Sequence, residues 1–272
     1  MSARSLLDFA ERACARVALP MLERRALDIS GPCARRSAIV LAPHPDDETL
    51  GCGAAILRKI DAGSHVTVVL ATDGRHSHHS GRLSAEKLVE MRTAEFREAC
   101  ARLGLQSTDV ISWGFEDGTL GANKDELTAR IRSVIDERGP QELLIPSDID
   151  GHADHRDLHA AAVRAAREAE FAGAILAYPV WFWTIKADLH GRRPTVINIV
   201  RALWAGVRTL ATIKTMSVDA AGVLGRKRHA IDAYESQLRT PADEPGWATI
   251  PEHVLRRFTR DKELYFPVGD HG

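Results

Sequence analysis

The sequence predicts a three-layer α/β fold in which helices cover both faces of a mostly parallel sheet. Short apolar runs alternate with longer amphipathic segments, and this alternation is typical of βαβ units. The chain has 272 residues, of which 44% are hydrophobic, so it is long enough to bury the core of one large domain. We therefore expect residues 1–272 to form a single domain.

Five strands and four helices are predicted from the pattern. The strands are expected at about residues 37–43, 65–71, 109–113, 142–146 and 174–179. The helices are expected at about residues 49–62, 84–103, 123–138 and 154–169. Gly104 ends the second helix and Gly139-Pro140 ends the third, because both are typical stop signals. Residues 1–35 predict an added helical segment whose packing partner the sequence does not identify.

An acidic turn follows the first predicted strand. It reads Pro43-His44-Pro45-Asp46-Asp47-Glu48 and comes directly after the apolar run at 39–42. Open α/β sheets bind their ligands at the carboxyl ends of strands, where this turn lies. His44 and Asp47 can face one point, and an imidazole with a carboxylate suits zinc or a similar divalent ion. Asp46 is then left for chemistry.

A second cluster, Gly151-His152-Ala153-Asp154-His155, follows the predicted strand at 142–146. A catalytic zinc takes three protein ligands and keeps one open position, which His44, Asp47 and one of His152 or His155 would provide. The alternative is that the acidic turn only caps a helix N-terminus and that the second cluster is a polar loop. The placement of both clusters at strand ends favours the metal site.

The pairing of P-H-P-D-D-E with a later H-A-D-H resembles the PIG-L family, also called LmbE-like, of zinc-dependent N-deacetylases and amide hydrolases. Further blocks resemble the family in the same order along the chain. They are Thr72-Asp73-Gly74, Arg92 with Glu95, Phe115-Glu116-Asp117-Gly118, and Arg226-Lys227 followed by Tyr234-Glu235-Ser236-Gln237. The resemblance implies a Rossmann-like sandwich and one metal ion per chain, zinc or another divalent ion such as ferrous iron.

The resemblance also implies a role for each candidate residue. The implied zinc ligands are His44, Asp47 and His155, with Asp46 as general base and His152 near the reacting carbonyl as a cation or hydrogen-bond donor. Asp154 would orient a histidine from outside the ligand set. Arg75 and Asp117 match positions near the substrate, where they would hold sugar hydroxyls or a phosphate.

The expected activity is removal of an acetyl group from an N-acetylated amino sugar of the N-acetylglucosamine type, linked to a lipid or a nucleotide. One alternative is an amidase that acts on a thiol-sugar conjugate or an acylated secondary metabolite. A different class of alternative is a sugar-binding protein that keeps the metal without catalysis. Asp46 favours turnover, because metal binding alone does not need it.

Composition limits the partners and the compartment. A formal net charge of -1 gives no overall attraction to nucleic acid. The four cysteines, at positions 14, 33, 52 and 100, form no C-x-x-C pair, so we expect a reducing compartment. Charged residues interrupt the apolar N-terminal region, and no apolar run approaches the roughly 18 to 20 residues of a membrane-spanning helix. The expected location is the cytoplasm.

The segment at 180–214 lies outside these motifs. It contains three of the five tryptophans, with six basic residues and one acidic residue. A lid, a peripheral membrane flap and a subunit contact in a homo-oligomer all fit this composition, and a packed structural element is favoured. The histidines at 76, 78 and 79 are interpreted as a polar loop, because no carboxylate or cysteine follows at ligand spacing. His159 is assigned to the surroundings of the metal site or to the surface.

Overall fold

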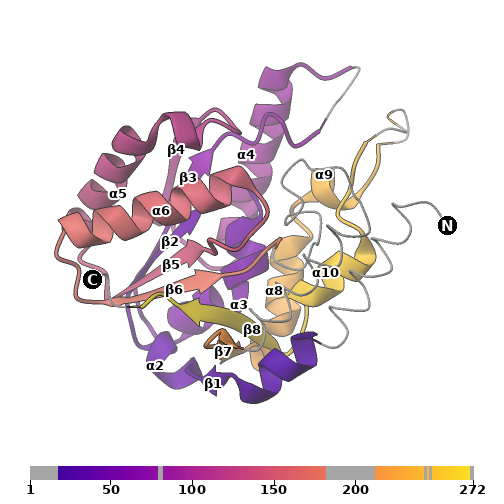
Figure 1. Ribbon diagram of the computed structural model, residues 1–272. Coiled ribbons are helices and arrows are strands. Elements are labelled where there is room, and N and C mark those ends of the chain that lie inside the picture. Colours follow the sequence, from indigo (N-terminus) through magenta and orange to yellow (C-terminus); the bar gives the residue numbers. More distant parts are fainter. Residues whose placement is uncertain (1–17, 79–81, 182–211, 242–243, 245–246, 270–272) are drawn as a thin grey trace, which may run out of the picture.

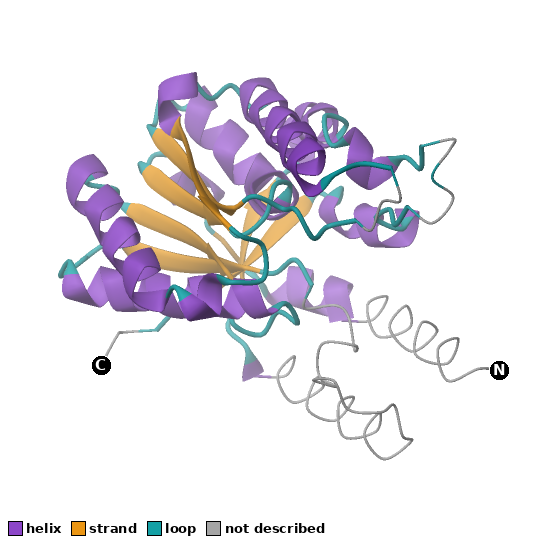
Figure 2. Ribbon diagram, turned by 90° about the horizontal axis from the view of Figure 1, so that it is seen from above, coloured by secondary structure: helices purple, strands orange, loops and turns teal. Residues whose placement is uncertain are grey.

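The computed structural model describes residues 18–78, 82–181, 212–241, 244 and 247–269. Eight strands form one sheet, and helices lie on both of its faces (Figures 1 and 2). This confirms the predicted three-layer α/β sandwich. The strands are β1 (Leu27–Asp28), β2 (Ala38–Ala42), β3 (Val66–Thr72), β4 (Val110–Phe115), β5 (Glu142–Pro146), β6 (Ala174–Tyr178), β7 (Met216–Asp219) and β8 (Lys262–Pro267).

The strand order is β1-β7-β8-β6-β5-β2-β3-β4. All neighbouring strands are parallel except β8, which is antiparallel to both β6 and β7. After β2 the chain builds β3 and β4 on one side, and it then returns to build β5 and β6 on the other side. The point between β2 and β5 is therefore the topological switch of the sheet, where open α/β folds bind their ligands.

The five predicted strands are present, and three further strands were missed. β1 has two residues and β7 has four, which is too short for a periodic signal. β8 begins with Lys262 and Glu263, a polar start that is untypical of a buried strand. The sheet is therefore mixed, with one antiparallel strand inserted among parallel ones.

The helices divide between the two faces of the sheet (Figures 1 and 2). They are α2 (Ser30–Ala34), α3 (Asp47–Asp61), α4 (Ala85–Arg102), α5 (Lys124–Arg138), α6 (Ala153–Glu168), α8 (Leu224–Ile231), α9 (Glu235–Leu238) and α10 (Glu252–Phe258). In β2, Ile39 and Leu41 pack into the core under α5 and α6, while Val40 and Ala42 pack into the core under α3, α4 and α8. This alternation lets one wholly apolar strand serve both cores.

Two buried charged side chains contact the backbone in the middle of α3. The carboxylate of Glu263 in β8 accepts bonds from the amides of Ala54 and Ala55, at 2.6 and 2.9 Å. Lys227 in α8 donates to the carbonyl of Leu50 at 2.8 Å and to Glu263 at 2.6 Å. Both side chains are buried, so each charge is neutralised by the other and by backbone groups of α3.

The same stretch of α3 approaches β6 and β8 closely. A Cβ on Gly51 would lie 2.3 Å from the ring of Tyr178, so only glycine fits there. The hydroxyl of Tyr265 in β8 lies 3.4 Å from the carbonyl of Gly51. The C-terminal elements therefore fix the position of the helix that begins at the acidic turn.

The structure identifies a packing partner for the N-terminal segment. Residues 18–25 are helical, and Leu19 and Leu22 pack against Leu264 of β8. Residues 1–17 and 182–211 lie outside the described part of the chain, so the expected lid, flap or subunit contact at 180–214 falls almost wholly outside it. Among the described helices, none has both the length and the apolar character that crossing a bilayer requires.

Candidate metal centre and active site

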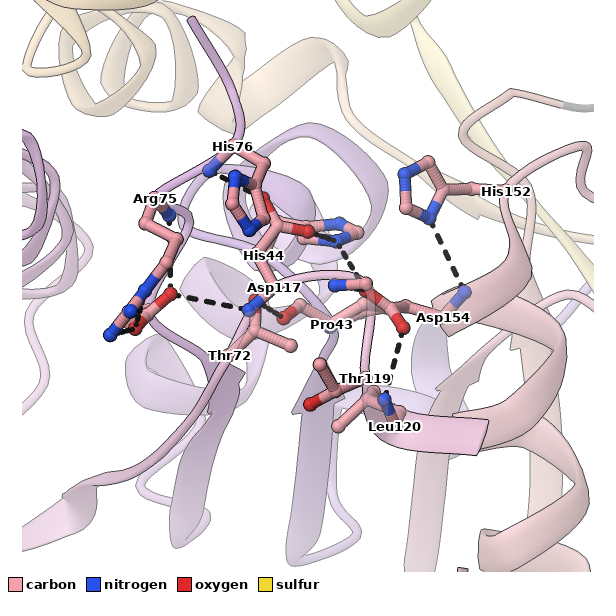
Figure 3. Close-up of polar contacts among 12 residues, drawn as sticks. Pro43, His44, Thr72, Arg75, His76, Asp117, Thr119, Leu120, His152 and Asp154 are labelled. Atoms are coloured by element: carbon pink, nitrogen blue, oxygen red, sulfur yellow. Dashed lines mark hydrogen bonds and ion pairs between the residues drawn. The ribbon is translucent and has the colours of Figure 1, made fainter. Parts of the chain in front are cut away.

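The loops that follow β2, β3, β4 and β5 meet at the carboxyl ends of these parallel strands and surround a cavity of about 540 Å³. Its lining includes His44, Asp46, Asp47, Asp117 and His152, so both predicted clusters contribute to it. Figure 3 shows His44 between the loop that carries Asp117 and the start of α6. The cavity therefore lies at the switch between β2 and β5, as the acidic turn predicted.

Three side chains present metal-binding atoms to one another. One carboxylate oxygen of Asp47, Oδ2, lies 3.2 Å from Nδ1 of His44 and 3.3 Å from Nε2 of His155. Ligand atoms about 2 Å from a tetrahedral zinc lie roughly 3.3 Å from one another, so these spacings fit a zinc ion. Nε2 of His155 is buried and has no hydrogen-bond partner, which leaves it available as a ligand.

Each of the two histidines has its other nitrogen held by a carboxylate. Nδ1 of His155 lies 2.9 Å from Asp150, and Nε2 of His44 lies 3.2 Å from Asp154 (Figure 3). Such contacts fix the tautomer and orientation of metal-binding histidines. Asp154 therefore contacts a histidine, and its orienting role stays a prediction. Asp150 was missed, because nothing in the loop sequence separates it from Asp148.

Two other groups of side chains also come close enough to hold an ion. One is His44, His152 and His155; the other is His44, Asp117 and Asp154. The carboxylate oxygens of Asp117 and Asp154 already accept bonds from backbone amides, as does Nδ1 of His152. Oδ2 of Asp47 likewise accepts a bond from the amide of His44, at 2.9 Å, so backbone contacts do not separate the three groups. His44, Asp47 and His155 are favoured because the buried Nε2 of His155 has no hydrogen-bond partner and one oxygen of Asp47 lies near both histidines.

Asp46 has a strained backbone at the start of α3. Its φ is 122°, in a region of backbone conformation that residues other than glycine rarely adopt. Holding a residue there costs about 1 to 3 kcal/mol of conformational strain. The guanidinium of Arg92, fully buried in α4, donates to the carbonyl of Pro45 and lies 3.3 Å from the Asp46 carboxylate. Arg92 thus holds both the strained turn and the side chain that it presents to the cavity.

The pKa values of the neighbouring Asp46 and Asp47 are shifted in opposite directions. Burial raises the pKa of Asp46 to about 6, and Arg92 opposes this rise. Burial acts in the same sense on Asp47, but His155 and His44 outweigh it and hold the pKa of Asp47 well below its usual range. Asp47 is therefore suited to remain an anionic ligand, and Asp46 to exchange a proton near neutral pH.

His152 lies at the cavity with a defined tautomer. Its Nδ1 accepts a bond from the amide of Asp154 at 3.3 Å, so the ring proton is on Nε2 (Figure 3). Partial burial of the ring and the neighbouring His44 and His155 lower the pKa of His152 to about 4. Of the two forms that the sequence left open, this geometry favours the neutral hydrogen-bond donor over the cation.

The two residues predicted to contact substrate have different surroundings. Asp117 lines the cavity, and its Oδ1 lies 3.2 Å from Nε2 of His44. Arg75 is paired with Asp73 at 2.7 Å, lies 3.7 Å from Glu116, and is not among the lining residues. In Figure 3 it lies away from His152. A substrate-binding role stays a prediction for both residues.

The histidines of the loop after β3 have structural contacts. His76 lies 3.3 Å from Glu116, and His78 stacks on Trp247 with ring centroids 4.0 Å apart. Neither belongs to a metal-binding group within the described residues, and position 79 lies outside them. His159 bonds the carbonyl of Pro146 at 2.9 Å, next to the loop that carries the second cluster.

The described cysteines at 33, 52 and 100 are free and buried. Burial raises the pKa of each thiol, to about 12 for Cys33 and well above the ordinary value for Cys52 and Cys100. A protonated thiol is a poor nucleophile and a poor metal ligand. Cys52 therefore serves in packing.

Residues 39–166 match the model of the PIG-L family, which is described as GlcNAc-PI de-N-acetylase. The chain is similar to the PIG-L family over this segment, which is just under half of its length. The matched segment contains both histidine and aspartate clusters, so the resemblance found in the sequence is confirmed. Over 281 aligned residues the chain is 28% identical to a 1D-myo-inositol 2-acetamido-2-deoxy-alpha-D-glucopyranoside deacetylase from Rhodococcus erythropolis, covering 88% of this chain and 95% of that relative.

Solved structures share the fold of this protein. The N,N'-diacetylchitobiose deacetylase from Pyrococcus horikoshii superposes with a TM-score of 0.63 at 20% identity, covering 95% of this chain and 92% of that one. The 4-carboxy-2-hydroxymuconate hydratase from Pseudomonas putida KT2440 gives 0.58 at 20% identity, covering 82% and 83%. These two likenesses show the fold alone, and one fold can support different reactions, so the function has to be argued from the site.

Proposed function

We propose that this protein removes the acetyl group from an N-acetylglucosamine-type amino sugar, releasing acetate and the free amine. Asp46 lines one cavity with His44 and Asp47, and Asp47 in turn contacts the buried His155. This placement of a base next to the donor set carries the proposal. The deacetylase relative that aligns over most of the chain supports the substrate class. A sugar-binding protein without catalysis would need only the donor atoms.

We infer that His44, Asp47 and His155 hold zinc. Two imidazole nitrogens and one carboxylate oxygen form a donor set typical of catalytic zinc sites that keep an open position. Bound there, zinc supplies a Lewis acid that polarises the amide carbonyl and lowers the pKa of water to about 7. Ferrous iron accepts the same donor types and is the alternative.

Asp46 acts as the base of the proposed reaction. Its carboxylate accepts a proton as a water oxygen bonds to the carbonyl carbon. The C–N bond then breaks, and Asp46 returns the proton to the leaving nitrogen, so that acetate and the amine leave with all protons accounted for. The pKa of Asp46, raised to about 6 by burial, allows both transfers near neutral pH.

His152 stabilises the negative charge that develops on the carbonyl oxygen. Its Nε2 carries the ring proton, and the residue lines the cavity, so the N–H can donate to that oxygen. Such a donor is worth roughly 3 kcal/mol when it is aimed at the developing oxyanion. Asp117, which also lines the cavity, is the proposed acceptor for a sugar hydroxyl.

A hydrolysis screen tests the function. Metal-loaded protein is incubated with free, inositol-linked, nucleotide-linked and lipid-linked N-acetylglucosamine, and with an N-acylated thiol-sugar conjugate. Released primary amine and acetate are then measured. We expect equimolar amine and acetate from at least one N-acetylglucosamine compound. Turnover of the thiol-sugar conjugate alone would favour the amidase alternative, and binding without any release would support the non-catalytic alternative.

Metal binding is expected to weaken as the pH falls, because protons compete for the same atoms. Burial opposes protonation of His155, but Asp47 and Asp150 outweigh it and raise its pKa to about 9. Below that pH a proton must leave His155 before Nε2 can bind an ion, and affinity should rise about tenfold per pH unit for each proton released. Calorimetry in two buffers of different ionisation enthalpy measures the protons released. Release of none would contradict this arrangement.

A further inference from the structure

A second hollow, of about 740 Å³, shares no lining residue with the catalytic cavity. Its wall comes from the helix at 18–25, from α8, from α10 and from the turn that leads into β8. Five cationic side chains line it: Arg24, Arg228, Arg256, Arg260 and Lys262. Only Glu23 and Asp261 oppose them, although the whole chain has a formal net charge of -1. We call this surface the basic hollow.

Two of the five cations have carboxylate partners. Arg260 pairs with Glu23 through two contacts, at 2.5 and 2.6 Å, and Arg256 pairs with Glu252 at 2.5 Å. The acidic charge of Glu23 is therefore already engaged. The other three cations exceed the one remaining acidic residue of the lining, Asp261, so the basic hollow keeps a net positive charge.

Within the described residues, no carboxylate forms an ion pair with Arg228, Lys262 or Arg24, although the charge of Lys262 also acts on Asp28. The guanidinium of Arg228 donates to the backbone carbonyl of Thr259 at 3.3 Å, and the ammonium of Lys262 donates to that of Glu23 at 3.1 Å. These contacts position the two head groups without removing their charge. A concave surface lined by one sign of charge concentrates its potential, which attracts anions.

One exposed apolar side chain, that of Met21, lies on the same helix as lining residues of the basic hollow. Met21 and Leu27 are the exposed large hydrophobic residues within the described ranges, with 41% and 63% of their surface accessible. Met21 is on the helix whose residues Glu23 and Arg24 line the basic hollow. Basic side chains next to exposed apolar ones are typical of helices that lie at a lipid surface.

We propose that the basic hollow docks the protein on an anionic phospholipid surface, with lipid phosphates in the hollow and Met21 entering the interface. The charge of the hollow complements phosphate, and the exposed Met21 favours a bilayer over a small soluble phosphate. The proposal is independent of the deacetylase reaction. It also involves other residues than the membrane flap expected at 180–214.

Sedimentation of the full chain with vesicles tests the proposal at low salt. Wild-type protein should bind phosphatidylglycerol vesicles, ignore pure phosphatidylcholine vesicles, and dissociate as salt is raised. Each cation near the surface should add about fivefold to binding, so Arg24→Gln, Arg228→Gln and Lys262→Gln together should weaken it about a hundredfold. Met21→Ser should weaken vesicle binding by the same factor at low and at high salt, because it removes an apolar contact and not a charge. This substitution removes no polar contact, so it tests the docking site even if the triple variant folds poorly.

The matched control removes three cations from the helices on the other face of the sheet, through Lys124→Gln, Arg132→Gln and Arg164→Gln. It should bind vesicles like the wild type. Equal losses in both triple variants would overturn the docking site, as would wild-type protein that ignores phosphatidylglycerol. Calorimetric binding of inorganic pyrophosphate that depends on Arg24, without any vesicle binding, would overturn it in favour of a soluble phosphate site.

Discussion

Asp46→Asn is expected to lower kcat by about 10² to 10⁴-fold while the protein keeps its fold and its metal. The amide is nearly isosteric with the carboxylate but cannot accept the proton of the attacking water. Asp46 also lies outside the proposed ligand set, so metal content should not change. Amine release under saturating substrate gives kcat, and elemental analysis of the same preparation gives the metal.

The adjacent residue provides the control for this experiment. Asp47→Asn changes the same chemical group one position further along α3, but it removes the oxygen that lies 3.2 and 3.3 Å from the two histidines. It should lose metal and activity together. Near wild-type kcat in Asp46→Asn would remove Asp46 from the mechanism.

Alanine at His44, Asp47 or His155 is expected to abolish stoichiometric metal binding, which the wild type should show at about one ion per chain. Each substitution removes one of three protein donors, and a catalytic zinc site has no fourth protein ligand to replace it. Because the metal and the base act together, activity should fall by at least as much as in Asp46→Asn. Elemental analysis after dialysis against a weak chelator measures the occupancy.

Asp117→Ala and His152→Ala distinguish the three donor sets. Both residues line the same cavity and lie near His44, but they belong to the alternative groups. Both variants should keep a full complement of metal. Loss of the ion in Asp117→Ala but not in Asp47→Ala would instead assign the site to His44, Asp117 and Asp154.

The sequence predicted the central strands of the sheet because each is a short apolar run between turn signals. It did not predict β8, because Glu263 is charged and charged residues are rarely buried. The buried carboxylate of Glu263 is stabilised by Lys227, 36 residues earlier, and by two backbone amides of α3. Such long-range compensation leaves no local pattern in the sequence.

In the site, the acidic turn and the second cluster were predicted from their positions at strand ends. The roles of Arg75 and Arg92 could not be separated in this way, because both are single basic residues in family-like blocks. Only the three-dimensional arrangement shows that Arg92 contacts Asp46 while Arg75 is engaged by Asp73. The left-handed conformation of Asp46 likewise depends on contacts from α4 and cannot be inferred from its neighbours in sequence.

The contacts of Glu263 and Lys227 with the middle of α3 bear on how this protein can be divided. The family match ends at residue 166, yet the helix that begins at the catalytic turn depends on partners 61 and 97 residues beyond that limit. Residues 39–166 expressed alone would leave those amides and carbonyls without their side-chain partners. We therefore expect a stable fragment to need the chain as far as β8, and shortening of the chain near its C-terminus should disturb the surroundings of Asp46 as well as the last strand.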